Sequence, residues 1–197
     1  MENLTKKIAV VGVMAAFSSV LMVLEFSLPI FPRFLEFNFS DLPALIIAFI
    51  YGPIPAAAIQ LIKCSIHLFF TETAGIGELS NFLIGAVWVV SAGLIYMMRR
   101  DKTGILLGLA GGSLFMAVTG IFTNYFIILP FYENVVEMPM TAIINMCSLI
   151  IPFVSTKWDV VLISILPFNI LKGIVISLIT FIVYKKIGHV LEKYNLK

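Results

Sequence analysis

The chain has 197 residues, of which 60% are hydrophobic and only 12% are charged, and its mean hydropathy is +1.06. Soluble domains are about 45–50% apolar and about 25% charged, so this composition excludes an ordinary water-soluble fold and predicts an integral membrane protein. The net charge of +2 is too small to indicate a nucleic-acid-binding protein.

The first apolar run, Ile8–Leu28, is long enough to cross a membrane, because a spanning helix needs about 20 residues. Lys6 and Lys7 precede it, as basic residues precede the apolar core of a secretory signal. That core is only about 7–15 residues long and ends at a small-residue cleavage site. Here the sequence Pro29–Pro32 (PIFP) follows, so we expect a retained first span.

The next apolar stretch, Leu42–Phe70, is interrupted by the sequence GPIP at residues 52–55. Proline lacks an N–H and crowds the preceding turn, so these residues stop a helix. The stretch is therefore either one broken span or a pair of short spans at 42–52 and 55–70. Residues 79–98, 105–129 and 160–187 also qualify as spans. Met140–Val154 is too short and suits a helix lying over the bundle.

Positive charge decides the number of spans. If 42–52 and 55–70 are a pair and 140–154 does not cross, nine of the 13 basic residues fall on one side of the membrane: Lys6, Lys7, Arg99, Arg100, Lys102, Lys185, Lys186, Lys193 and Lys197. A single crossing at 42–70 would break this asymmetry, which the positive-inside rule disfavours. The sequence predicts one all-α membrane domain over residues 1–197, with six transmembrane helices and both termini cytoplasmic.

No motif of a soluble enzyme or a metal site is present in the sequence. Cys64 and Cys147 lie in apolar stretches, and neither they nor His67 and His189 have the spacing of a disulfide framework or a metal site. Walker A, GxGxxG and GxSxG sequences are absent. The glycine-rich run Gly108–Gly112 lies inside a span, where it favours close helix packing over ligand binding.

An ionisable side chain inside a span is costly and indicates a functional site. Lys172 lies about halfway along the last span, with Asn169 one turn earlier on the same face and Pro167 predicting a kink. We favour a pair of donors facing a cavity. The alternative is a lysine that pairs with a buried acid for packing.

Other polar residues lie on the third predicted helix and near helix ends. The i, i+3, i+7 spacing puts three of them on one helical face: Gln60, Lys63 and His67. They either line a cavity or face a polar neighbour. Glu78 reads foremost as a helix-start cap, whereas Asn81 and Asn124, with the neighbouring Tyr125, are as compatible with ligand binding as with capping.

The loop Pro29–Asp41 (PIFPRFLEFNFSD) interleaves four phenylalanines with polar residues. Interfacial aromatic residues are often only a membrane belt. This loop, however, lies on the side that has little basic charge, and its surface would suit a planar, apolar ligand that also forms hydrogen bonds.

These residues resemble the substrate-capture (S) components of energy-coupling factor (ECF) transporters over nearly the whole chain. The motifs are similar to those of the riboflavin-specific S components: EFNFSDLPA at residues 36–44, GP at 52–53, Lys63, GELSNF at 77–82, and Asn169-x-x-Lys172.

The resemblance implies a riboflavin-binding subunit of a vitamin uptake transporter in the bacterial cell membrane, with no enzyme activity and no cofactor of its own. The ligand would lie near the extracellular side, under the loop after helix one. Asn124, Asn169 and Lys172 would hydrogen-bond its isoalloxazine or ribityl groups. The full predicted ligand-binding set is Phe37, Asn38, Phe39, Ser40, Lys63, Asn81, Asn124, Tyr125, Asn169 and Lys172.

The resemblance also implies partners, namely a transmembrane coupling (T) subunit and two ATPases. The coupling subunit would contact small residues of helix one, Gly12 and Ala16, where the family usually has alanines. The alternatives are an S component for thiamin or biotin, a membrane-embedded enzyme, and a channel or small carrier. An enzyme needs a nucleophile–base or metal constellation, and His67, Glu72 and Glu78 suggest one only loosely. A secondary transporter would show matching half-repeats, which are not apparent.

Overall fold

Five helical runs of the computed structural model are long and apolar enough to cross a membrane: Leu4–Val23, Pro53–Phe70, Ile76–Met98, Lys102–Asn134 and Lys157–Lys186. The prediction of a helical membrane protein is therefore confirmed. The structure describes the backbone of residues 2–71 and 73–193 and the side chains of residues 4–71 and 73–186. Glu72, Lys197 and the side chains of His189 and Lys193 lie outside the described part of the chain.

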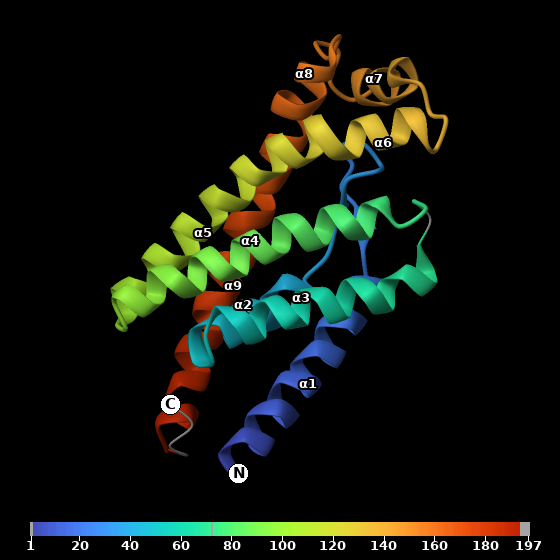
Figure 1. Cartoon of the computed structure of the whole chain (residues 1–197). Coiled ribbons are helices and arrows are strands. Elements are labelled where there is room, and N and C mark those ends of the chain that lie inside the picture. The colour runs from blue at the N-terminus through green and yellow to red at the C-terminus, as the bar shows by residue number, and fades with distance from the viewer. Residues whose placement is uncertain (1, 72, 194–197) are drawn as a thin grey trace.

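The elements in chain order are α1 (Glu2–Val23), β1 (Phe26–Ser27), β2 (Glu36–Phe37), α2 (Asp41–Ile50), α3 (Pro53–His67) with a 3-10 turn (Leu68–Phe70), α4 (Ile76–Met98), α5 (Lys102–Thr123), a π-helical turn (Asn124–Ile128), α6 (Leu129–Asn134), α7 (Met140–Ser148), α8 (Lys157–Asp159), a second π-helical turn (Val160–Ile165) and α9 (Leu166–Lys193). The two strands pair antiparallel, with Phe26 opposite Phe37. In Figure 1 the long helices run side by side, and α7 lies across one end of the bundle, as its length predicts.

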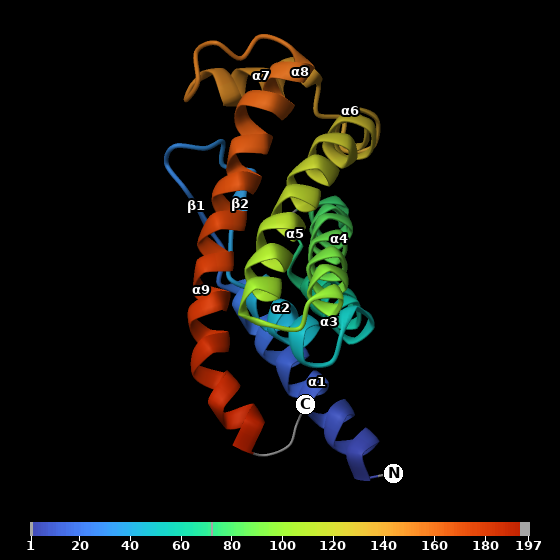
Figure 2. The same cartoon turned by 90° about the vertical axis from the view of Figure 1, so that its left-hand side faces the viewer.

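The chain ends of the bundle lie together. Both termini are at the lower end in Figures 1 and 2, whereas α6, α7 and α8 are at the upper end. The connection between α4 and α5, which contains Arg99 and Arg100 and leads into Lys102, lies at the left of Figure 1, also away from α6, α7 and α8. Within the described part of the chain, the basic residues that the positive-inside argument groups on one side thus belong to segments that lie away from α6, α7 and α8.

The break between α2 and α3 follows from two residues. Gly52 has φ +94° and ψ 179°, a backbone conformation that is essentially restricted to glycine. Pro53 then begins α3, where its missing N–H costs nothing and its fixed φ is already helical. The helix before the break, α2, is buried over Pro43–Phe49 and is apolar on all sides, as expected of a central helix.

Two predicted helix ends differ from the structure. Helix α1 ends at Val23, not at Leu28, because Phe26 and Ser27 pair with β2. The fifth span does not end before Pro130 but continues to Asn134, and the π-helical turn Asn124–Ile128 precedes the proline. A second π-helical turn, Val160–Ile165, precedes Pro167. Such turns accommodate a proline by shifting the hydrogen-bond ladder.

The glycines of α5 permit close packing against α4. A Cβ at Gly108 would lie 2.7 Å from the Ala92 carbonyl oxygen, and one at Gly112 would lie 2.9 Å from the Ala92 Cβ. The packing interpretation of this glycine run is therefore confirmed. The tight contact fixes the two helices that form one wall of the cavity described next.

Candidate functional site

A cavity of about 770 Å³ lies among the β1–β2 loop, α4, the C-terminal end of α5, the N-terminal end of α9, and α7. All of these elements approach the end of the bundle opposite the termini (Figures 1 and 2). Pockets for small ligands are typically about 300–1,000 Å³ and mostly apolar, with a few polar groups. The apolar lining here includes Phe34, Ile84, Trp88, Met116 and Phe168.

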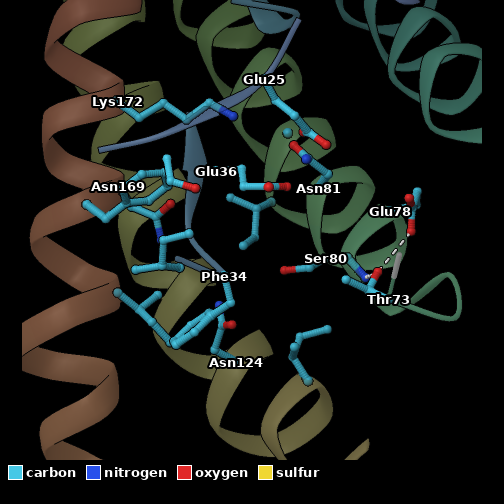
Figure 3. A pocket seen from close by; sticks show the side chains of 18 of the residues that line it. Glu25, Phe34, Glu36, Thr73, Glu78, Ser80, Asn81, Asn124, Asn169 and Lys172 are labelled. Atoms are coloured by element: carbon cyan, nitrogen blue, oxygen red, sulfur yellow. Dashed lines mark hydrogen bonds between the residues drawn. The ribbon is translucent and has the colours of Figure 1, made fainter. Parts of the chain in front are cut away.

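Four residues of the predicted ligand-binding set line this cavity: Asn81, Asn124, Asn169 and Lys172. In Figure 3, Asn169 and Lys172 extend from α9 toward the space that Glu36 and Asn81 reach from the other side. Asn124 lies at the start of the π-helical turn, where its amide nitrogen donates to the Gly120 carbonyl at 2.8 Å. Three separate helices therefore bring their polar side chains to one space.

The other six predicted residues do not line the cavity: Phe37, Asn38, Phe39, Ser40, Lys63 and Tyr125. Successive side chains of an extended strand point to opposite sides. Glu36 lines the cavity, and Phe37 is turned to an aromatic cluster, with ring centroids 5.6 Å from Phe26 and 5.4 Å from Phe39.

Tyr125 has a different environment from its neighbour Asn124. Its ring stacks on Trp158 with 4.0 Å between centroids, and the Lys157 ammonium lies 4.3 Å from the ring centre. Consecutive helical residues point in different directions, so the adjacent Asn124 can line the cavity when Tyr125 does not. Tyr125 and Trp158 form an aromatic pair of the kind found at membrane interfaces.

A buried carboxylate, Asp41, links the polar stripe of α3 to α9. Its Oδ1 lies 2.6 Å from the Lys63 Nζ and accepts a hydrogen bond of 2.9 Å from Gln60. Its Oδ2 lies 2.9 Å from the Lys172 Nζ. The stripe thus faces a polar neighbour. Lys172 combines both interpretations of the sequence, because it pairs with a buried acid and also lines the cavity.

A chain of polar contacts runs from this cluster along the β1–β2 segment. Lys63 donates to the Ser40 hydroxyl at 2.7 Å, and that hydroxyl donates to the side-chain oxygen Oδ1 of Asn38, also at 2.7 Å. Asn38 in turn donates to Glu25 at 3.4 Å. These bonds explain the complete burial of Asn38, Ser40 and Lys63, which are 0% exposed. Buried polar groups of this kind need such partners.

His67 lies between two carboxylates at the edge of the cavity. Its Nδ1 is 2.9 Å from Glu78 and its Nε2 is 3.4 Å from Glu25. A neutral imidazole has one N–H, so only the doubly protonated ring can donate to both carboxylates. The interpretation of Glu78 as a helix cap is wrong. The N-cap residue is Gly75, and Glu78 instead accepts from Thr71 at 2.9 Å and from Thr73 at 3.3 Å.

Two residues of the cavity wall have a buried donor with no partner in the described part of the chain. These donors are the Trp88 indole Nε1 and the Asn169 amide Nδ2. An unpaired buried polar group is uncommon and calls for an explanation. Gly120 leaves room for the Asn169 amide, because a Cβ there would lie 2.4 Å from Nδ2. With Lys172, these donors give the wall side-chain N–H groups beside the carboxylates of Glu25, Glu36, Asp41 and Glu78, which also line the cavity.

Asp41 and Trp88 are site residues that the sequence pattern did not reveal. Asp41 was considered only as the last residue of the loop Pro29–Asp41, and a tryptophan in an apolar span gives no signal of its own. Asp41 could have been found by charge balance, because Lys63 and Lys172 both lie within predicted spans. Two lysines buried in a bilayer need an acidic partner.

Comparisons with known proteins agree on one family. Residues 6–184 match the family described as "ECF transporter, substrate-specific component". The riboflavin transporter RibU of Staphylococcus aureus is 29% identical over 189 residues, which cover 95% of this chain and 93% of that protein. The riboflavin transporter FmnP of Bacillus subtilis is 29% identical over 191 residues, 95% of each chain. A solved structure described as the S component of a bacterial ECF transporter has a TM-score of 0.76 and 28% identity, and the match covers 95% of this chain and 98% of that one.

Proposed function

The chain belongs to the substrate-specific components of ECF transporters, and we propose that it captures riboflavin at the outer face of the bacterial cell membrane. Two relatives that match almost end to end are named riboflavin transporters, which supports this ligand over thiamin or biotin. The family consists of transporter components, so we expect binding and delivery without catalysis.

The character of the cavity wall is the observation that carries the proposal. Riboflavin has a flat, largely apolar isoalloxazine ring that carries carbonyl oxygens and ring nitrogens as acceptors. The cavity offers aromatic and aliphatic side chains together with unpaired N–H donors on Trp88 and Asn169 and the ammonium of Lys172. A ligand rich in acceptors would satisfy the Trp88 and Asn169 donors, whose unpaired burial otherwise costs about 1–3 kcal/mol each, and could also accept from Lys172.

We infer six membrane crossings, with the cavity open to the outside. The five long apolar runs and the ten-residue helix α2 make six, and an even number agrees with two termini at one end. The cavity lies at the other end, away from the helix ends that carry most of the basic residues. By the positive-inside rule, the basic end is cytoplasmic.

For delivery we propose that α1 binds the transmembrane coupling subunit, which works with two ATPases. Gly12 and Ala16 lie four residues apart on an exposed face of α1, and a Cβ at Gly12 would meet nothing within 4 Å. Helices associate in lipid through close contact at small residues. Neither Gly12 nor Ala16 lines the cavity, so a partner could cover this surface without blocking the ligand.

The proposal is tested by titrating riboflavin with the purified protein in detergent, without ATP or partner subunits. We expect saturable quenching of flavin fluorescence, because the ring becomes enclosed among aromatic side chains. Thiamin and biotin, measured in parallel by calorimetry, should not bind. Binding of either vitamin without any response to riboflavin would replace the proposal with another S-component specificity.

A further inference from the structure

We propose that Asp41 is a positioning residue, which acts on the ligand by holding the ammonium of Lys172 at the cavity wall. This inference rests on the proposed function, because the ligand used to test it is riboflavin. In the sequence, Asp41 is only the last residue of the loop Pro29–Asp41, and its contacts with two lysines arise only in the tertiary structure.

The geometry assigns one Asp41 oxygen to each of two lysines. Oδ2 faces Lys172 of α9 at 2.9 Å, and Oδ1 faces Lys63 of α3 at 2.6 Å. The Asp41 side chain is only 2% exposed, and three helices therefore meet at one carboxylate. Gln60 also donates to Oδ1, so Oδ1 is shared, whereas Oδ2 faces Lys172.

The two lysines have different relations to the cavity. Lys63 is 0% exposed, does not line the cavity, and donates to both Asp41 and Ser40. Lys172 lines the cavity and forms an ion pair with Asp41. An ammonium has three donors, so Lys172 can keep its bond to Asp41 and still donate to a ligand.

Positioning matters here because a lysine side chain is long and flexible. Its four-carbon stem can move the charged head toward water or a headgroup, and this is the usual behaviour of lysine in a membrane helix. A fixed carboxylate removes that freedom before the ligand arrives, so less entropy is lost on binding. Lys63 has the supporting role: two cations and one anion give the cluster a net charge of +1, and Asp41 stays paired if Lys172 turns to the ligand.

The same charge count supplies a matched experiment. Replacing Asp41 alone would leave two buried cations side by side, whereas Asp41→Asn with Lys63→Met retains Lys172 and the net charge of +1. Lys172→Met then lowers the charge from +1 to 0 in both the wild-type protein and this double variant. Long-range effects of charge on the ligand are therefore the same in both backgrounds. Lys63→Met alone keeps the Asp41–Lys172 pair and is the reference for the double variant, because it isolates the effect of losing Lys63.

We expect Lys172→Met to weaken riboflavin binding by roughly ten- to over a hundredfold in the wild-type background. The double variant should itself bind at least about tenfold more weakly than wild type, and adding Lys172→Met to it should cost less than about threefold. A purely structural role of Asp41 would leave the Lys172 effect equal in both backgrounds. Equal effects, or a double variant with wild-type affinity, would overturn the proposal.

Asp41→Glu provides a second test that does not depend on how the double variant folds. It keeps the charge and both acceptor oxygens but moves the carboxylate by about one methylene, and small displacements of a positioning group weaken function. We expect riboflavin affinity to fall by at least about threefold in a protein that elutes as wild type on size exclusion. Wild-type affinity of Asp41→Glu would contradict positioning by Asp41. A wild-type protein that binds no riboflavin would refute the proposed function instead, and the two failures are thus distinguishable.

Discussion

Gly120→Ala should weaken riboflavin binding without destabilising the protein. Gly120 lies on α5 opposite Asn169, and an added Cβ would be 2.4 Å from the Asn169 Nδ2. The next contacts, Asn169 Cγ at 3.4 Å and Ile84 Cδ1 at 3.8 Å, are already ordinary van der Waals distances. Only the end of the Asn169 side chain has to move.

The size of the effect follows from that displacement. Relief of the clash requires the amide to shift by about 1 Å, which is enough to lose a hydrogen bond whose length is about 2.9 Å. A neutral hydrogen bond contributes about 0.5–1.5 kcal/mol, so the dissociation constant should rise roughly two- to tenfold. Alanine in place of glycine stabilises a helix interior by up to about 1 kcal/mol. The melting temperature should therefore stay constant or rise while affinity falls.

The assay is riboflavin titration by fluorescence quenching together with thermal unfolding in detergent. Gly111→Ala on the same helix is the matched control, because its Cβ would meet only the end of the flexible Ile95 side chain, at 2.6 Å, away from the cavity lining. In an Asn169→Ala background, Gly120→Ala should have no further effect on affinity. An unchanged affinity in Gly120→Ala, or the same loss with Asn169 already removed, would refute the reasoning.

Three further predictions concern coupling, the backbone and the buried charges. Gly12→Leu and Ala16→Leu should abolish riboflavin uptake and co-purification of the coupling subunit but leave the affinity for riboflavin intact, because both positions are exposed. Loss of riboflavin binding would show instead that Gly12 and Ala16 serve internal packing. Gly52→Ala should lower the free energy of unfolding by about 1–3 kcal/mol from backbone strain alone, since its Cβ would meet nothing within 4 Å; an unchanged melting temperature would contradict this. His67→Ala should destabilise by roughly 1–3 kcal/mol because buried Glu78 keeps its bonds from Thr71 and Thr73 but loses the contact of its Oε1 with His67, and adding Glu78→Gln should restore most of the loss in thermal melts.

The bundle was largely predictable, because its features depend on short stretches of sequence. Long apolar runs must be helical in lipid, where each backbone polar group needs a partner within its own segment. The break at Gly52 and Pro53 was visible for the same reason: wherever they occur, glycine permits backbone conformations that other residues avoid, and proline interrupts a continuing helix. The family resemblance and the match over residues 6–184 agree with this local reading.

Of the candidate site, the polar residues inside spans were the recoverable part. Lys172, Asn169, Asn124 and Asn81 stood out because such side chains are expensive in lipid, and all four line the cavity. Trp88 could not be found in this way, because an aromatic residue in an apolar helix is ordinary and only its lack of a hydrogen-bond partner distinguishes it.

The sequence by itself thus determined that the chain is helical, lies in a membrane and carries costly polar groups at particular places along its helices. Only the tertiary structure decided which of those groups meet. Asp41 reaches both Lys63 and Lys172 because α2, α3 and α9 converge, and Glu36 rather than Phe37 lines the cavity because of the orientation of one short strand. Partners far apart in the sequence are chosen by helix packing and side-chain direction, and no local pattern of residue types encodes these.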